Sequence, residues 1–275
     1  MSTFSQRYGY SEEQGIQYET VGERLRNRLW NKFFTESYDA DPFSKNENSL
    51  TNIEYVMDTM GLIFDIPRVV GARAKNVKKL KEYVFDDSRW YLIYDLIEQY
   101  VGLFDKSEQR YLCKEFNDIL EDECSGYRFV KGLITPITNE EEIKAIEKAS
   151  STKYSAVNTH ISKALALFSD RKHHDYENTI KESISAVEAL CCIITNDKKA
   201  TLGDALKKLE NNGIKLHKAL QSAMSSLYGY TSDESGIRHG SIDFAGASSE
   251  DAKYMLISCS AFVNYLIEKW EKTKQ

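Results

Sequence analysis

The amino-acid sequence predicts a mostly helical protein with two domains. Only three prolines occur in 275 residues, and proline is the residue that breaks helices most strongly. Long stretches carry apolar residues at the three- and four-residue spacing of an amphipathic helix. One stretch, residues 127–137, is instead rich in β-branched and aromatic residues around Lys131-Gly132, which is typical of a hairpin turn. The expected fold class is mostly α, with two helical domains and a small β-hairpin near the domain boundary.

The pattern predicts five helices in the first half. Residues 1–17 are polar and aromatic without clear periodicity, and the first helix begins near Thr20. This helix is expected to place Leu25, Leu29 and Phe33 toward the core. The four that follow are expected at residues 50–65, 70–85, 88–104 and 107–123.

A domain boundary is expected directly after the hairpin. Thr138-Asn-Glu-Glu141 offers a capping side chain followed by acids, which is typical of a helix start. The predicted domains are therefore residues 1–137, helical and ending in the β-ribbon, and residues 138–275, a helical bundle. Its helices are expected at residues 140–148, 153–169, 176–195, 201–211, 215–227 and 249–270.

Two helices of the second half are expected to face a common core, because each carries an apolar seam at helical spacing. The first seam comprises Ile180, Ile184, Val187, Cys191 and Ile194. The second comprises Met255, Cys259, Phe262, Leu266 and Trp270.

Composition excludes several classes of protein. With 36 basic and 42 acidic residues the net charge is -6, so any site for a polyanion must be local. The five cysteines lack metal-ligand spacing, and the sequence predicts neither a disulfide scaffold nor a metal or other cofactor. No signal pattern and no run of roughly 18 apolar residues occurs. We therefore expect a soluble, cytoplasmic protein without a membrane segment.

The strongest candidate site is the segment from Tyr230 to Ser241. It places Arg238 and His239 between Gly236 and Gly240, so the backbone can turn sharply and present the pair. Arginine supplies a planar fork of donors for a phosphate, and histidine can transfer a proton near neutral pH. We therefore expect His239 and Arg238 to be catalytic.

Four further residues of this segment are expected to contribute to binding: Tyr230, Ser232, Asp233 and Gly236. An alternative interpretation stays open. In it the histidine caps the next helix, while the arginine pairs with Asp233 or Glu234.

Glu188 is a third candidate catalytic residue. It follows Val187 of the first seam and lies four residues after Ile184, so it projects from the border of the buried stripe. A carboxylate there could orient His239. The alternative is a partly buried acid that pairs with Lys181 or with a backbone donor.

The first half carries two cationic stretches. Helical spacing puts Lys75, Lys78 and Lys79 on one side of a helix, where they could bind RNA phosphates or form a solvated face. Residues 24–30 hold three arginines followed by Trp30. That stretch offers either a second cationic and aromatic surface or contacts that serve packing.

Three segments of the second half resemble a HEPN domain of the kind found in abortive-infection proteins: residues 181–190, 201–206 and 228–239. The first half is similar to the AbiJ-type N-terminal domain 4, through Phe4-Ser-Gln-Arg7, Leu25-Arg-Asn-Arg-Leu-Trp30 and the ribbon. These resemblances imply a bacterial antiphage or toxin protein that forms a homodimer. They also imply an RNA or nucleotide partner, a regulatory partner protein, and metal-independent RNA cleavage in active members.

The sequence departs from the HEPN hallmark, which is an arginine followed by four to six residues and then the histidine. Counting back from His239, the corresponding positions hold Ser232, Asp233 and Glu234, and Arg238 is directly adjacent instead. Two functions therefore stay open. The domain could cleave RNA, or it could be a noncatalytic module that binds a nucleotide, RNA or a protein.

Overall fold

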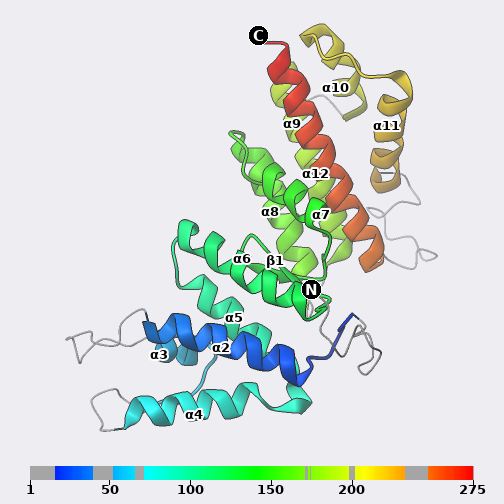
Figure 1. Ribbon diagram of the computed structural model, residues 1–275. Helices are drawn as coiled ribbons and strands as arrows, with labels where there is room; N and C mark the ends of the chain where they lie inside the picture. Colours follow the sequence, from blue (N-terminus) through cyan, green and yellow to red (C-terminus); the bar gives the residue numbers. More distant parts are fainter. Residues whose placement is uncertain are drawn as a thin grey trace, which may run out of the picture. The chain divides into compact units, whose positions relative to one another are not determined.

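The structure is a computed structural model that describes residues 16–39, 52–65, 71–170, 173, 175–197, 202–232 and 247–274. These residues form mostly α-helices and one two-stranded antiparallel hairpin (Figure 1). The predicted fold class is therefore confirmed. The contacts of the chain divide it into two compact units, residues 1–138 (unit 1) and residues 139–275 (unit 2).

Unit 1 places a central helix, α5, against four others, α6 among them. In the described residues its elements are α2 (Glu23–Asp39), α3 (Asn52–Thr59), α4 (Ala72–Val84), the 3-10 helix η1 (Asp87–Arg89), α5 (Leu92–Gly102), α6 (Lys106–Asp122), β1 (Arg128–Val130) and β2 (Leu133–Thr135). Helices α2, α3 and α4 all pack against α5, and α2 also packs against α6. The core of the unit thus collects around α5.

The core of unit 1 is rich in aromatic side chains. The predicted inward residues Leu25, Leu29 and Phe33 are fully buried. Phe33 contacts Tyr100 of α5 edge to face, with ring centroids 5.1 Å apart. Edge-to-face contacts of this kind add stabilisation beyond the burial of apolar area.

The hairpin forms at the predicted place. Strands β1 and β2 pair with Arg128 opposite Thr135 and Val130 opposite Leu133. Lys131 and Gly132 make the turn with φ angles of 51° and 85°, and a two-residue turn with both φ positive matches the twist of the strands.

We expect Gly132→Ala to destabilise unit 1 by about 1–2 kcal/mol, because an L-residue is strained at positive φ. A Cβ there would have nothing closer than 3.9 Å, so backbone strain rather than a clash causes the loss. Gly102→Ala is the matched control, since a Cβ on this helical glycine meets nothing within 4 Å and alanine favours helix. Urea unfolding of both variants checks the prediction, and equal effects would contradict it.

Unit 2 is a bundle organised around helix α9. Its described elements are α7 (Glu140–Ala149), α8 (Ser155–Ser169), α9 (Tyr176–Thr195), α10 (Leu202–Lys208), the 3-10 helix η2 (Leu209–Asn212), α11 (Lys218–Ser232) and α12 (Ser249–Lys272). Helix α9 packs against α8, α10, α11 and α12, and α12 also packs against α7. Figure 1 shows α9 and α12 side by side along most of their length.

The two predicted seams meet in this bundle. All five residues of the α9 seam are buried, as are four of the five on α12, whereas Trp270 is partly exposed. Trp270 instead stacks on Tyr154, with ring centroids 5.6 Å apart. The prediction that these helices share a core is confirmed by their packing.

Two predicted boundaries in unit 1 were wrong by several residues. Helix α3 ends at Thr59 rather than near Asp65, because Gly61 adopts a φ of 68°, which a continuing helix does not allow. The stretch predicted as one helix at 88–104 is a 3-10 turn followed by α5. Asp86 caps this turn by accepting a hydrogen bond from the Ser88 amide at 2.9 Å.

Candidate functional site

The predicted Arg238-His239 pair lies outside the residues that the structure describes, together with Asp233 and Gly236. Tyr230 and Ser232 lie in the last turn of α11. On the far side of the segment, Ser248 caps α12 in a capping box with Asp251, which fixes where this helix begins. The segment is thus bounded by one formed helix on each side.

Glu188 lies on α9, the helix that contacts both α11 and α12. It is partly buried and follows the fully buried Val187. Burial raises the pKa of the Cys191 thiol to about 12, and the nearby charge of Glu188 contributes to this shift. The Cys191 thiol therefore stays protonated at neutral pH. The negative charge of Glu188 favours this protonated form.

Sequence reasoning missed a polar cluster between α8 and α9. The imidazole Nδ1 of His160 lies 2.6 Å from Glu182 Oε2, and Lys163 Nζ donates to Glu182 Oε1 at 3.1 Å. The side chains of His160 and Glu182 are 33% and 15% exposed. The sequence carried one signal for this cluster. His160 precedes the α8–α9 turn and Glu182 follows it by a similar number of residues, and residues so placed face each other in a helical hairpin.

The His160 cluster makes a pH-dependent contribution to stability. Burial raises the pKa of Glu182, but hydrogen bonds from His160 and Lys163 lower it more, so this pKa is depressed below its usual value. The resulting stabilisation is present above the unfolded-state pKa and is lost as the pH falls through the folded-state pKa. We expect Glu182→Gln to be less stable than wild type at neutral pH, with the difference vanishing in acid.

This prediction is checked by urea unfolding between pH 3 and pH 7. That range spans roughly four units around a carboxyl pKa. Glu210→Gln is the control, because Glu210 is exposed and makes no side-chain ion pair among the described residues. A Glu182→Gln difference that persisted unchanged at the acid end would contradict the assigned cause.

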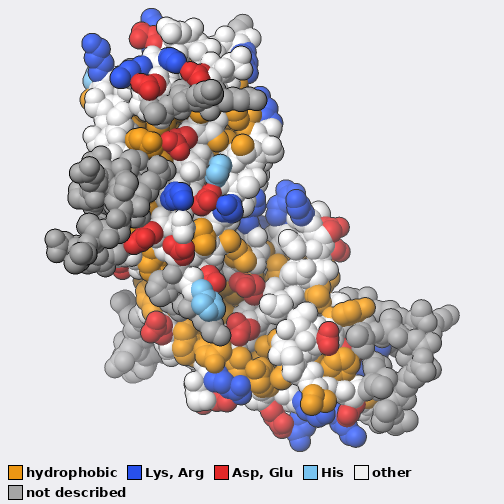
Figure 2. Space-filling model, turned by 180° about the vertical axis from the view of Figure 1, so that it is seen from behind, with side chains coloured by type: hydrophobic (Ala, Val, Ile, Leu, Met, Phe, Trp, Pro, Cys, Tyr) orange, Lys and Arg blue, Asp and Glu red, His pale blue; other side chains and the backbone are white. Residues whose placement is uncertain are grey.

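The three lysines predicted to face one way lie on α4 and are exposed. Lys78 lies 3.8 Å from Glu82, and Lys79 lies 3.7 Å from Asp65. Figure 2 shows Lys and Arg side chains interspersed with Asp and Glu over the coloured part of the view, without one broad basic field. Exposed pairs of this kind contribute about 0–1 kcal/mol, so they hold these lysines only weakly.

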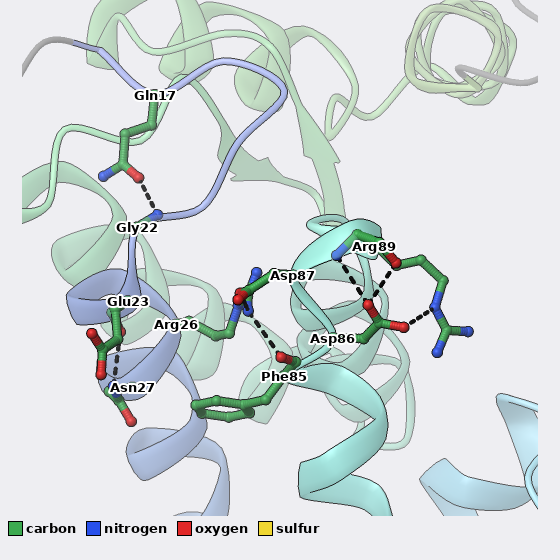
Figure 3. Close-up of polar contacts among 10 residues, drawn as sticks. Gln17, Gly22, Glu23, Arg26, Asn27, Phe85, Asp86, Asp87 and Arg89 are labelled. Carbon is green, nitrogen blue, oxygen red and sulfur yellow. Dashed lines mark hydrogen bonds and ion pairs between the residues drawn. The ribbon is translucent and has the colours of Figure 1, made fainter.

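The arginines of α2 form ion pairs within unit 1, and of the three Arg26 is the one that is buried. Arg26 is buried, and its Nη1 donates to the carbonyl of Phe85 at 3.2 Å and pairs with Asp87. Figure 3 shows Arg26 reaching from α2 to the corner that follows α4. Arg24 and Arg28 both pair with the fully buried carboxylate of Glu123, at 3.0 and 2.6 Å.

Neither a metal-binding cluster nor a membrane-spanning helix occurs in the described residues. No group of three or more His, Cys, Asp or Glu side chains in that part of the chain is placed to hold a metal ion. Asp175, in the turn before α9, instead caps that helix by accepting from the Asn178 amide at 2.9 Å. No helix in the same residues is long and apolar enough to cross a membrane.

The fold thus defines a helical protein of two units, the first closed by a β-hairpin and the second a bundle around one central helix. A sequence profile of the AbiJ N-terminal domain 4 matches residues 2–152, more than half of the 275-residue chain. The chain belongs to this AbiJ N-terminal domain family. The match covers unit 1 and continues through α7 of unit 2. No curated protein and no solved structure matches the chain.

Proposed function

We propose that this protein acts in bacterial antiphage defence by abortive infection, with unit 2 as a HEPN-like domain that cleaves or binds RNA. Membership of the AbiJ N-terminal domain family supports the defence role. In this proposal unit 1 senses a trigger or a regulatory partner protein in the cytoplasm. Two copies of unit 2 form a homodimer that brings their Arg238-His239 segments into one cleft.

His239 is the proposed proton-transfer residue. A general base that takes the proton of a ribose 2′-hydroxyl makes that oxygen a nucleophile toward the adjacent phosphorus. Arg238 would hold the phosphate and offset the charge that develops on it. Glu188 would orient the pair.

One observation carries this assignment more than any other. Helices α11 and α12, which bound the Arg238-His239 segment on its two sides, both pack against α9, and α9 carries Glu188. The two helices that flank the segment therefore both contact the helix that holds the proposed orienting carboxylate. A proton-transfer site requires its groups to be held in place, and a shared helix is one means of doing so.

The second candidate function is a noncatalytic module that binds a nucleotide, RNA or a protein. Ser232, Asp233 and Glu234 stand where a HEPN hallmark arginine would be expected, and this favours binding without turnover. The acids would also repel an incoming phosphate unless Arg238 or a second copy neutralised them.

Incubation of the purified protein with total bacterial RNA in chelator tests the proposal. Site-selective cuts that leave cyclic-phosphate ends are the result expected of a metal-independent ribonuclease. RNA that is retained on the protein without any cut would favour the binding module. Neither cleavage nor retention by the folded protein would overturn the proposed role of unit 2.

A further inference from the structure

Unit 1 contains a small cleft at a point where three helices end or begin. The cleft has a volume of about 150 Å³ and is lined by Thr59, Met60, Tyr83, Leu92, Asp95 and Gln99. Thr59 is the last residue of α3, Tyr83 is next to the last of α4, and Leu92 is the first of α5. Ligand sites for drug-sized molecules span roughly 300–1,000 Å³, so this cleft suits the head group of a ligand rather than a large molecule.

The polar groups of the cleft are available to a ligand. Asp95 and Gln99 make no side-chain hydrogen bond or ion pair with any residue in the described part of the chain. Thr59 donates its hydroxyl to the carbonyl of Val56 at 2.9 Å, which leaves the oxygen able to accept. The lining therefore offers more acceptors than donors, and one of them carries a charge.

The Asp95 carboxylate is the charged group among the lining residues of the cleft. It lies in the first turn of α5, where the helix N-terminus favours a negative charge. Desolvation by its neighbours raises the pKa of Asp95 above its usual value, although the residue is exposed. Because the carboxylate is exposed and makes no pair among the described residues, a cationic or N–H donor ligand can reach it directly.

Two further features favour a planar donor. The C-terminal ends of α3 and α4 lie at the cleft, and the exposed carbonyls of a helix C-terminus attract positive charge. Tyr83 contributes an aromatic ring. The Arg89 guanidinium covers one face of it at 4.5 Å from the centroid, so a ligand would use the other face. A planar group can stack on such a ring while its edge meets a carboxylate.

We propose that this cleft binds a small molecule whose planar head presents two adjacent N–H donors, the chemistry shared by a guanidinium group and the base edge of guanine. The two donors would form a bidentate pair with Asp95. Tyr83 would stack on the head, Gln99 and Thr59 would bind its remaining polar atoms, and Leu92 and Met60 would contact its apolar edge. This site goes beyond the proposed action on RNA, because it equips unit 1 to recognise a small ligand.

Calorimetric titration of the full chain tests this proposal and separates the two sources of the donor pair. Guanosine is compared with inosine, which lacks the exocyclic amine, and agmatine is compared with putrescine, which lacks the guanidinium. We expect guanosine or agmatine to bind at least about tenfold more tightly than its matched partner, as the loss of a charge-assisted hydrogen bond requires. The arm that binds identifies the source.

Asp95→Asn is expected to weaken that binding by at least about tenfold, because the neutral amide cannot make the charge-assisted pair. It should keep the fold, since it removes a desolvated charge. Asp58→Asn is the matched control, because Asp58 is exposed on α3 beside Thr59 but does not line the cleft. The proposal would be overturned if Asp95→Asn retained binding in full. It would also be overturned if the wild-type protein bound neither guanosine nor agmatine in the millimolar range.

Discussion

Replacement of His239 by alanine is expected to lower RNA cleavage by a factor on the order of 100 to 10,000, the range that general acid–base groups contribute. The reason is chemical, because His239 is the side chain of the segment from Tyr230 to Ser241 whose type ordinarily gains and loses a proton near neutral pH. Sequencing of fragment ends after incubation with bacterial RNA in chelator measures the effect. Circular dichroism of the variant establishes that it is folded.

His173→Ala is the control for this experiment. His173 is 74% exposed and lies in the turn between α8 and α9, so its loss should leave cleavage unchanged. If His239→Ala cleaved as well as wild type, His239 would be removed from the mechanism. Arg238→Ala then separates the two candidate functions. In a binding module this variant would lose affinity for RNA, and the RNA would stay uncut with either protein.

Phe33→Ala should be the most destabilising single change predicted in unit 1, with a loss of about 3–5 kcal/mol. The Phe33 side chain is fully buried, and its ring contacts both Tyr100 and Trp30, with centroids 5.1 and 5.6 Å away. Truncation would leave a cavity that these rings cannot fill. Because a domain is stable by only about 5–15 kcal/mol, the variant should lie close to unfolding at ordinary temperature.

Tyr111→Ala provides the comparison for Phe33→Ala. Its ring is 54% exposed and contacts Lys32 Nζ at 5.7 Å from the centroid. An exposed cation–π contact contributes about 0.5–1 kcal/mol, so its loss should be several times smaller. Thermal unfolding of both variants followed by circular dichroism measures the difference. Similar losses would show that the Phe33 ring is not the centre of the core.

Most helices of unit 2 were predictable because their signals are local. The exceptions are the stretch predicted as one helix at 201–211, which is α10 followed by η2, and α11, which runs to Ser232 instead of ending near Leu227. Helix α9 spans Tyr176–Thr195, which is the predicted range. Its apolar seam recurs every three or four residues, and Asp175 supplies the cap at its start. The hairpin was predictable for a similar reason, since Lys131-Gly132 is a turn pair between two short apolar stretches.

The candidate site could be predicted only in part. The Arg238-His239 pair was selected for its chemistry between two glycines, and it lies outside the described residues. Glu188 was selected for its place beside the apolar seam, and the structure shows it partly buried on the helix that contacts α11 and α12. Its proposed contact with His239 depends on the segment between those helices and stays a prediction.

The sequence by itself determined the fold class, the hairpin and the apolar faces of the helices, because each depends on residues within a few positions of one another. Only the tertiary structure decided which polar groups meet. His160 pairs with Glu182 across 22 residues, and Arg28 pairs with Glu123 across 95. The Tyr83 and Asp95 cleft likewise exists because the ends of α3, α4 and α5 come together. Such contacts depend on how whole helices pack, and local periodicity carries no information about which helix faces which.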